Sequence, residues 1–418
     1  GMVYGAGAAE LIPGSTWNES KVYTDSESKL KVRQVTSAGL YNRGPTYHLN
    51  TGFSKDSRYF IFATMRQGRT ALMRADTASG DIKVLFVGPE LKNYDEVKPK
   101  AALTKQPRLE GNLIALSQET GKVAVVIHYL NDLYLVDMYT GKAEKLIDHK
   151  DHPSEVLKTP SFSKDGSRLI VPTAVDPDYT PYRQKKTYPM TYFSYNVKDG
   201  SRRVFYDEKN WGHAHLQENP RKKDQWLFCL GRPAWLSSGK ARALAKMKSE
   251  KMNIFDSKTG KKYVIKPRSK YKEVSHPSIN YAGDRVIYHG QPKKGMYIGA
   301  VDLAGNTIWE YVFTNWKYNV NGSNHLGAHT RSNIIIEDGI VQAGCISFID
   351  YSKAGKSGAP KVTTIARHDT EWKGLPGQLS HPHPHISPDG RYLAYNACHN
   401  GRTNLYIVDL KSRNKIEK

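Results

Sequence analysis

The chain has 418 residues, of which 39% are hydrophobic and 11% are aromatic. This composition can bury a core, so it excludes a largely disordered protein. The formal net charge is +22, which favours a polyanionic partner such as nucleic acid, anionic lipid or an acidic polysaccharide. A solubility adaptation is the alternative explanation of the charge. Lys and Arg are spread along the chain instead of forming a basic tail, so no nucleic-acid-binding arm is predicted.

The three cysteines, Cys229, Cys345 and Cys398, are too far apart to form a zinc knuckle or a disulfide framework. No apolar run approaches the length of a membrane span, so membrane insertion is not expected. The initial Gly-Met is not typical of a natural start, and we expect a secretion signal to have been removed. This favours a periplasmic or secreted protein, with a cytoplasmic location as the alternative.

Two sequence patterns recur along the chain. The first is a short strand, an Asp or Gly turn and a strand of β-branched or aromatic residues, found at 51–62, 160–171, 276–288 and 378–395. The second is an alternating strand that ends in Asp before a turn, as in Leu133–Asp137. Two hairpins per unit imply four strands, and the repeat of about 40–55 residues is typical of propeller blades.

We therefore predict an all-β fold, a seven-bladed β-propeller that forms a single domain over residues 1–418. Only three strands fit after residue 378, so the segment 29–35 is expected to close the ring as the outer strand of the last blade. A pair of β-sandwiches is the alternative, and a short helix is expected at 237–249. The predicted blades begin near residues 46, 110, 158, 211, 273, 324 and 378.

The segment Gln378–Gly390 places His381, His383 and His385 at alternating positions before a Ser-Pro-Asp-Gly turn. Residues two apart in a strand share a face, so we expect the three imidazoles to point the same way. Further histidines fall on or just before the predicted first strands of other blades, which line the channel of a propeller. These are His48, His213, His215, His276, His325 and His329.

Such a ring of imidazoles suits a transition metal when an amide or carboxylate oxygen accompanies it. The metal could act on a substrate, and a structural metal that only ties blades together is the alternative. No Walker loop, dinucleotide fingerprint, hydrolase elbow or HExxH motif is present.

Other candidate groups are expected at the same mouth of the channel. The loop 176–189 is rich in Tyr and cations, and Tyr188 could act as a general acid or base while Arg183 pairs with a carboxylate or sulfate. His128 ends the second strand of the second blade, and His149 lies in the loop that follows that blade. Arg232 occupies the corresponding position in the fourth blade.

The pattern Gln378-x-x-His381-Pro-His383-Pro, followed by Ser-Pro-Asp-Gly, resembles the metal motif of oligogalacturonate lyases, which are seven-bladed propellers. The resemblance implies a divalent metal, with Mn favoured and Zn or Ca as alternatives. It also implies that His276, Gln378, His381 and His383 hold the metal. His385 lies outside the family motif.

The resemblance further implies a polysaccharide lyase that cleaves an acidic, uronate-containing oligo- or polysaccharide by β-elimination, with no role for nucleic acid. Trp211-Gly-His213 resembles the family segment that carries the proposed base, whereas the spacing to Pro220 favours His215. Tyr188 is the alternative base or acid. The chain departs from the family at 230–233, where Leu-Gly-Arg-Pro replaces His-Glu-Gly-Pro.

Ulvan lyases are similar propellers that use histidine, tyrosine and arginine on a sulfated polysaccharide. His128, His149, Arg183 and Arg232 would contact the substrate in that case. The contrasting hypothesis is a non-catalytic propeller of the TolB type that binds a protein or a polyanion.

Overall fold

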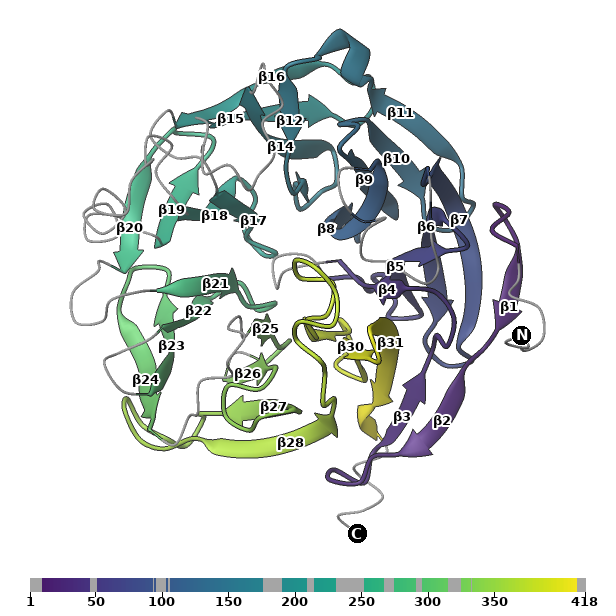
Figure 1. Cartoon of the computed structure of the whole chain (residues 1–418). Coiled ribbons are helices and arrows are strands. Elements are labelled where there is room, and N and C mark those ends of the chain that lie inside the picture. Colours follow the sequence, from purple (N-terminus) through teal and green to yellow (C-terminus); the bar gives the residue numbers. More distant parts are fainter. Residues whose placement is uncertain are drawn as a thin grey trace.

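All regular structure in the computed structural model is β-strand, apart from one single-turn 3-10 helix, η1 (His149–Asp151), among the residues described. Small antiparallel sheets stand radially around a central axis, each with one strand near the axis and one at the periphery (Figure 1). This arrangement is a β-propeller, so the predicted all-β class is confirmed. The structure describes residues 10–45, 51–92, 94, 103, 106–175, 190–208, 214–230, 252–266, 274–290, 295–314, 325–331 and 333–411. The helix predicted at 237–249 lies outside them.

Five sheets follow one another along the middle of the chain, and most have four strands that pair in chain order. The first contains β8 (Arg108–Leu116), β9 (Lys122–His128), β10 (Leu133–Asp137) and β11 (Ala143–Ile147). The second contains β12 (Glu155–Leu157), β13 (Ser161–Phe162), β14 (Arg168–Val175), β15 (Met190–Asn196) and β16 (Arg202–Glu208). The third contains β17 (Ala214–Glu218), β18 (Gln225–Leu230), β19 (Met252–Asp256) and β20 (Lys262–Lys266). The fourth contains β21 (Ser275–Ile279), β22 (Arg285–Gly290), β23 (Met296–Asp302) and β24 (Thr307–Phe313). The fifth contains β25 (Leu326–Ala328), β26 (Ile334–Glu337), β27 (Cys345–Asp350) and β28 (Lys361–Arg367).

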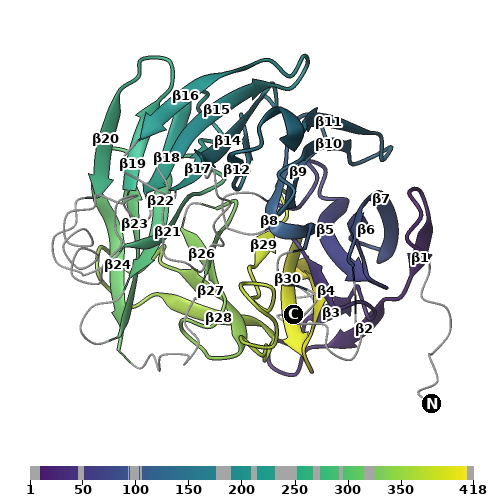
Figure 2. The same ribbon diagram turned by 45° about the horizontal axis from the view of Figure 1, so that its top comes forward.

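A ten-stranded sheet joins the two ends of the chain. β3 pairs antiparallel with β31, with Val32 opposite Val408, and β4 pairs with β31 in parallel through Tyr41 and Thr403. Figure 2 shows these N-terminal strands beside the C-terminal ones. The N-terminal strands are β1 (Thr16–Asn18), β2 (Lys21–Thr24), β3 (Lys31–Gln34), β4 (Tyr41–Arg43), β5 (Tyr59–Arg66), β6 (Arg69–Asp76) and β7 (Asp81–Glu90). The C-terminal strands are β29 (His385–Ile386), β30 (Tyr392–His399) and β31 (Arg402–Asp409).

The first recurring pattern forms a tight turn held by its own side chains. Ser163 Oγ donates a hydrogen bond of 2.7 Å to Asp165 and accepts one of 2.9 Å from the backbone N–H of Arg168. Ser387 does the same with Asp389 and Tyr392. These side chains satisfy backbone groups that the reversal leaves open, so each Ser-x-Asp motif ends an inner strand and starts the next one.

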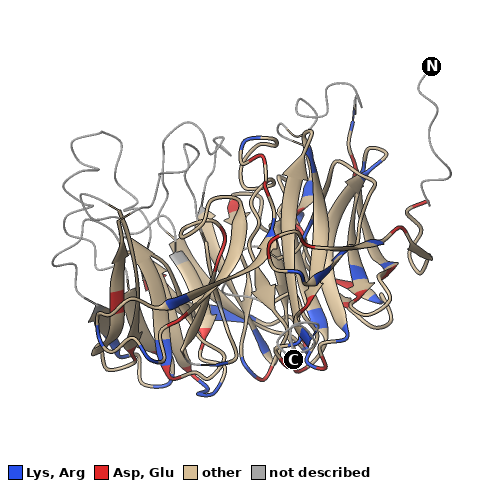
Figure 3. Cartoon of the chain, turned by 90° about the horizontal axis from the view of Figure 1, so that it is seen from below, with Lys and Arg blue, Asp and Glu red and all other residues tan. Residues whose placement is uncertain are grey.

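The innermost strands give the molecule two distinct mouths. These strands run in the same direction in a propeller, so their first residues lie at one mouth and the Ser-x-Asp turns lie at the other. Lys and Arg positions are interspersed with Asp and Glu positions at the turns along the lower end of the molecule in Figure 3. No helix among the described residues is long and apolar enough to cross a membrane.

Candidate metal centre and active site

Four histidines from three neighbouring sheets converge where the inner strands begin. His381 and His383 precede β29, His325 precedes β25, and His276 is the second residue of β21. Ligand nitrogens of His325, His381 and His383 all lie within 4.8 Å of one another. The ring centres of His325 and His383 are 3.8 Å apart, and those of His276 and His325 are 4.9 Å apart. We call these four residues the histidine cluster.

The histidine cluster fits a divalent metal. His325, His381 and His383 are 1%, 6% and 2% exposed. Nδ1 of His381 is buried and has no hydrogen-bond partner among the described residues. A buried polar atom without a partner is costly, and a cation would satisfy this lone pair. Convergent imidazoles are the donor set that Mn, Zn and similar ions accept.

The backbone around these histidines is not the strand that the alternating pattern predicts. Only His385 and Ile386 belong to β29, and His383 has a φ of 46°. The expectation that three histidines share one strand face is therefore wrong. Pro382 and Pro384 have no N–H to donate to a ladder, so this segment cannot continue as a paired strand.

The strained, left-handed backbone seen at His383 recurs at His276, the metal-ligand candidate on β21. His276 also has a φ of 46°, and the β21–β22 register shifts between Ser275 and Ser278. Left-handed backbone at a residue other than glycine is uncommon and is concentrated at functional sites. Nδ1 of His276 lies 2.7 Å from Nε2 of His289.

The electrostatics keep the histidines neutral. Burial and, to a smaller extent, the positive charge of Arg43 lower the pKa of His381 to about 3. Burial and Arg43 also place the pKa of His383 well below its usual value. Arg43 lies at the end of β4 and is 1% exposed. Neutral imidazoles keep the lone pairs that a metal ligand or a general base requires.

Gln378 and His385, the other candidate residues of the segment Gln378–Gly390, have different surroundings from each other. Gln378 lies in the same loop, its backbone carbonyl accepts the N–H of His381 at 3.1 Å, and its side-chain oxygen is buried. The side chain of His385 contacts a different segment, since its Nε2 lies 2.9 Å from the carbonyl oxygen of Pro45. Burial lowers the pKa of His385 to about 4. This position agrees with a structural role for His385.

Three groups at the histidine cluster lie outside the ligand set that the resemblance implies, although His325 belongs to the ring of imidazoles expected near the channel. They are His325, the buried Asp338 behind it, and Arg43. Asp338 Oδ2 lies 3.0 Å from Nδ1 of His325. In the sequence Asp338-Gly339 has the appearance of an ordinary turn, and no local signal marks Arg43. His329, which the sequence grouped with His325, packs against Phe348 instead.

His128 lies beside a buried ion pair at the start of β8. Arg108 and Glu110 approach to 2.5 Å, and Nδ1 of His128 is 3.4 Å from the other carboxylate oxygen of Glu110. Burial alone would raise the pKa of Glu110, but His128 and Arg108 lower it to about 2. The ring of His128 stacks on Tyr129 with centres 4.2 Å apart. His128 is therefore a partly exposed imidazole held against a permanent negative charge.

His149 belongs to a second group of metal-type ligands, with Asp132 and Asp148. Its Nδ1 lies 2.9 Å from Asp132. The ammonium of Lys145 lies 2.9 Å from Asp132 and 3.0 Å from Asp148, so a cation of the chain itself already neutralises both carboxylates. This group fits an ion-pair network at the surface better than a metal site.

The candidate bases and arginines are only partly covered by the structure. His215 is the second residue of β17 and is 9% exposed, so it lies near the start of an inner strand. The remaining predicted residues, His213, Tyr188, Arg183 and Arg232, lie outside the described residues.

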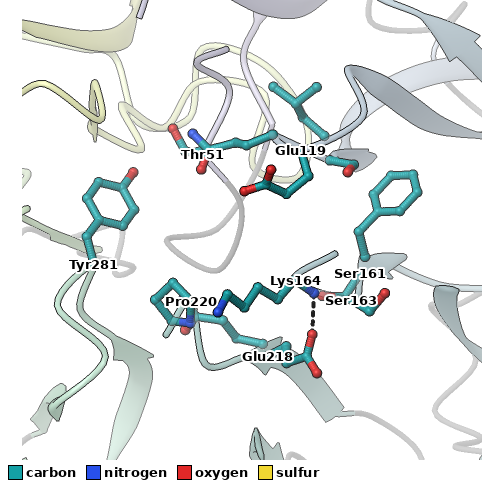
Figure 4. A pocket seen from close by; sticks show the side chains of 13 residues that line it. Thr51, Glu119, Ser161, Ser163, Lys164, Glu218, Pro220 and Tyr281 are labelled. Atoms are coloured by element: carbon teal, nitrogen blue, oxygen red, sulfur yellow. Dashed lines mark hydrogen bonds between the residues drawn. The ribbon is translucent and has the colours of Figure 1, made fainter. Parts of the chain in front are cut away.

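A cavity of about 150 Å³ opens at the opposite mouth, among the ends of the inner strands. Figure 4 shows Glu119, Lys164 and Tyr281 around it, with the backbone N–H of Lys164 bonded to Glu218. The hydroxyl of Tyr281 donates a hydrogen bond of 3.1 Å to the carbonyl oxygen of Ile386. Tyr281 thus lines this cavity and is hydrogen-bonded to β29, the strand that follows His381 and His383.

Comparison with solved structures places the fold among known propellers. An oligogalacturonate lyase from Vibrio parahaemolyticus aligns with a TM-score of 0.71 and 15% identity, covering 96% of this chain and 99% of that chain. An oligogalacturonate lyase in complex with manganese aligns with a TM-score of 0.73 and 16% identity, over the same shares. No family model and no curated protein sequence matches the chain. The chain therefore has the fold of oligogalacturonate lyases over nearly its whole length, with little of their sequence.

Proposed function

We propose that the protein is a polysaccharide lyase that cleaves an acidic, uronate-containing oligo- or polysaccharide by β-elimination. The observation that carries the proposal is the histidine cluster, with its buried His325, His381 and His383, at one mouth of a propeller with the oligogalacturonate lyase fold. We also propose seven blades, with the ten-stranded sheet forming the first and the last. In this arrangement β3 is the strand that closes the ring.

His276, Gln378, His381 and His383 are proposed to hold the metal, with Mn favoured and Zn or Ca as alternatives. When bound, the ion would supply positive charge to the substrate carboxylate as an enolate-like charge develops. The chain prepares this site by burying the imidazoles and by placing Arg43 beside them, which keeps their nitrogens unprotonated near neutral pH.

The base removes the C5 proton of a uronate, and the C4–O bond then breaks to leave an unsaturated sugar. His213 or His215 is proposed as the base, with Tyr188 as the alternative base or acid. A neutral imidazole has a pKa suited to proton abstraction near neutral pH. His215 is the second residue of the inner strand β17, and the histidine cluster also lies where inner strands begin, which supports this assignment.

Substrate contacts are proposed for His128, His149, Arg183 and Arg232. His128 is the best supported by position, since it lies opposite Arg108 at the start of an inner strand and is partly exposed. The net charge of +22 fits a polyanionic substrate. A galacturonide is the favoured polymer, and a sulfated ulvan is the alternative.

The test incubates the full chain with polygalacturonate, with ulvan and with other uronate polymers, each with and without Mn²⁺. The ultraviolet absorbance of the unsaturated product should rise on at least one polymer. His381→Ala should abolish the rise, and the exposed His399→Ala should leave it unchanged. Absence of product on every polymer would refute the lyase and favour a non-catalytic, polyanion-binding propeller.

A further inference from the structure

His325 has the surroundings of a metal ligand, although it lies outside the sequence motif that suggested the metal. Its side chain is 1% exposed and its ring centre lies 3.8 Å from that of His383. We propose that His325 is a ligand of the same metal and that Asp338 is the residue that positions it. The inference rests on the proposed metal centre and enlarges it by one imidazole.

The spacing of the nitrogens supports the ligand role. Two nitrogens on one ion, each bonded at about 2.1 Å, are at most about 4.2 Å apart. The ligand atoms of His325, His381 and His383 already lie within 4.8 Å of one another. Three atoms within 4.8 Å of one another all lie within about 2.8 Å of a common point, so side-chain shifts of under about 0.7 Å bring all three to bonding distance.

Asp338 selects the tautomer of His325. Its Oδ1 accepts the backbone N–H of His325 at 2.6 Å, and its Oδ2 lies 3.0 Å from Nδ1 of the ring. A proton on Nδ1 that is donated to a carboxylate leaves the Nε2 lone pair for the metal. Carboxylate–histidine–metal arrangements of this kind orient the ring and raise its basicity.

The same carboxylate reaches the other side of the centre. Oδ2 of Asp338 also accepts the backbone N–H of His383 at 3.3 Å. His383 has the strained φ of 46°, and such a conformation persists only when its surroundings hold it. Asp338 has 0% exposure and lies just after β26, so it ties a ligand loop to a neighbouring sheet. One buried side chain thus places two histidines at once.

The experiment measures metal affinity, because activity alone would not separate a ligand from a base. Mn²⁺ binding to the full chain is measured by calorimetry and by equilibrium dialysis with elemental analysis. His325→Ala should weaken binding at least about tenfold, and Asp338→Asn should weaken it by about 10- to 100-fold. His329→Gln is the matched control, since His329 is a buried histidine four residues further on that packs against Phe348. It should bind Mn²⁺ as the unmodified chain does.

A second readout addresses the coordination directly. The unmodified chain loaded with Co²⁺ should show visible bands whose intensity changes in His325→Gln, because losing a ligand changes the coordination geometry. His325→Gln also serves if His325→Ala fails to fold, as judged by thermal unfolding.

Unchanged Mn²⁺ affinity and an unchanged Co²⁺ spectrum in a folded His325 variant would overturn the inference. Failure of the unmodified chain to bind any metal would overturn both the inference and the metal part of the proposed function. Metal binding that depends on His325, without lyase activity on any polymer, would refute the proposed reaction and leave the inference standing.

Discussion

At the scale of single residues, the groups at the channel mouth combine buried charges with neutral histidines. Arg108 and Glu110 form a buried pair directly behind His128, while Arg43 lies beside the histidine cluster. Each charge favours one protonation state of its neighbours. Burial and Arg43 lower the pKa of His381 and His383, so these two imidazoles are unprotonated near neutral pH, which is the condition for metal binding.

Glu110→Gln tests the buried ion pair. The substitution leaves the guanidinium of Arg108 buried without its counter-charge, so the free energy of unfolding should fall by about 3 kcal/mol. Denaturant unfolding measures the loss. Glu119→Gln is the control, because its pair with Lys55 is exposed and should contribute little. Equal effects of the two substitutions would contradict a special role for the buried pair.

Metal addition should stabilise the folded chain through the histidine cluster. A ligand that binds only the folded state raises stability by about 2.7 kcal/mol at a hundred times its dissociation constant. We expect Mn²⁺ to raise the unfolding temperature of the unmodified chain and EDTA to reverse the effect. His381→Ala should remove the response, whereas the exposed His399→Ala should keep it. A response that persists in His381→Ala would place the metal elsewhere.

At the scale of elements, the strand β3 joins the two ends of the chain. Val32 in β3 is completely buried and belongs to a core cluster with Ile346 and Val408, while Val22 in the adjacent β2 is 53% exposed. The hydrophobic contribution of β3 therefore comes from the face that packs against the neighbouring β25–β28 sheet.

Val32→Ala measures that contribution. Removing two buried methyl groups should lower the free energy of unfolding by about 2 kcal/mol, from lost transfer energy and the cavity left behind. Val22→Ala makes the same chemical change one strand away at an exposed position and should be nearly neutral. A similar cost at both positions would show that β3 does not contribute through burial.

The hydrogen bond of Tyr281 with Ile386 links the segment that follows β21 to β29, which belongs to a different sheet. Tyr281→Phe removes a hydrogen bond of 3.1 Å and should cost about 1 kcal/mol of stability. Tyr263→Phe is the control, because its hydroxyl also donates to a backbone carbonyl but its side chain is 43% exposed. Mn²⁺ affinity should be unchanged in both, and a loss in Tyr281→Phe would mean that this contact supports the histidine cluster.

At the scale of the whole molecule, buried histidines make the fold sensitive to acid. Burial lowers the pKa of His329 to about 4 and that of His368 to about 3, both below the value of about 6.5 in an unfolded chain. Below that value the unfolded state binds protons that the folded state does not, so stability falls as the pH decreases. The stability is fully present above pH 6.5 and is lost progressively toward pH 4.

Unfolding temperatures at pH 7.5, 6 and 5, measured in EDTA, test this expectation. Each such histidine should cost at most about 2 kcal/mol at pH 5. His368→Gln should reduce the difference in unfolding temperature between pH 7.5 and pH 5, whatever its effect on the unfolding temperature at pH 7.5. A constant unfolding temperature over this range would contradict the expectation, because it would show that protonation of the buried histidines does not destabilise the folded state.

Much of the architecture could be predicted because it depends on neighbours in the chain. Alternation of apolar and polar residues specifies strands, and turns such as Ser163-x-Asp165 close through side chains two residues apart. The all-β class and the recurring hairpins follow from these local rules. The motif Gln378-x-x-His381-Pro-His383 likewise pointed to the loop whose two histidines the structure brings close to His325.

The composition of the site depends on contacts between distant segments, which local rules do not describe. Alternation predicted one strand for His381 and His383. Pro382, Pro384 and the left-handed backbone at His383 prevent this segment from forming a paired strand. Arg43 approaches these histidines only because β4 pairs with β31 at the other end of the chain. Such positions are decided by packing of whole sheets, where small shifts change which side chains meet.

The sequence by itself determined the strand pattern, the turn chemistry and a pool of histidines near the starts of inner strands, because these properties are encoded within a few residues. The tertiary structure alone decided which histidines converge, since His325 is brought to His383 by adjacent sheets and by the shared carboxylate of Asp338. Burial raises the pKa of Asp338 well above its usual value, while hydrogen bonds from the backbone of His325 and His383 favour its charged form. No single stretch of sequence contains both the burial and these partners.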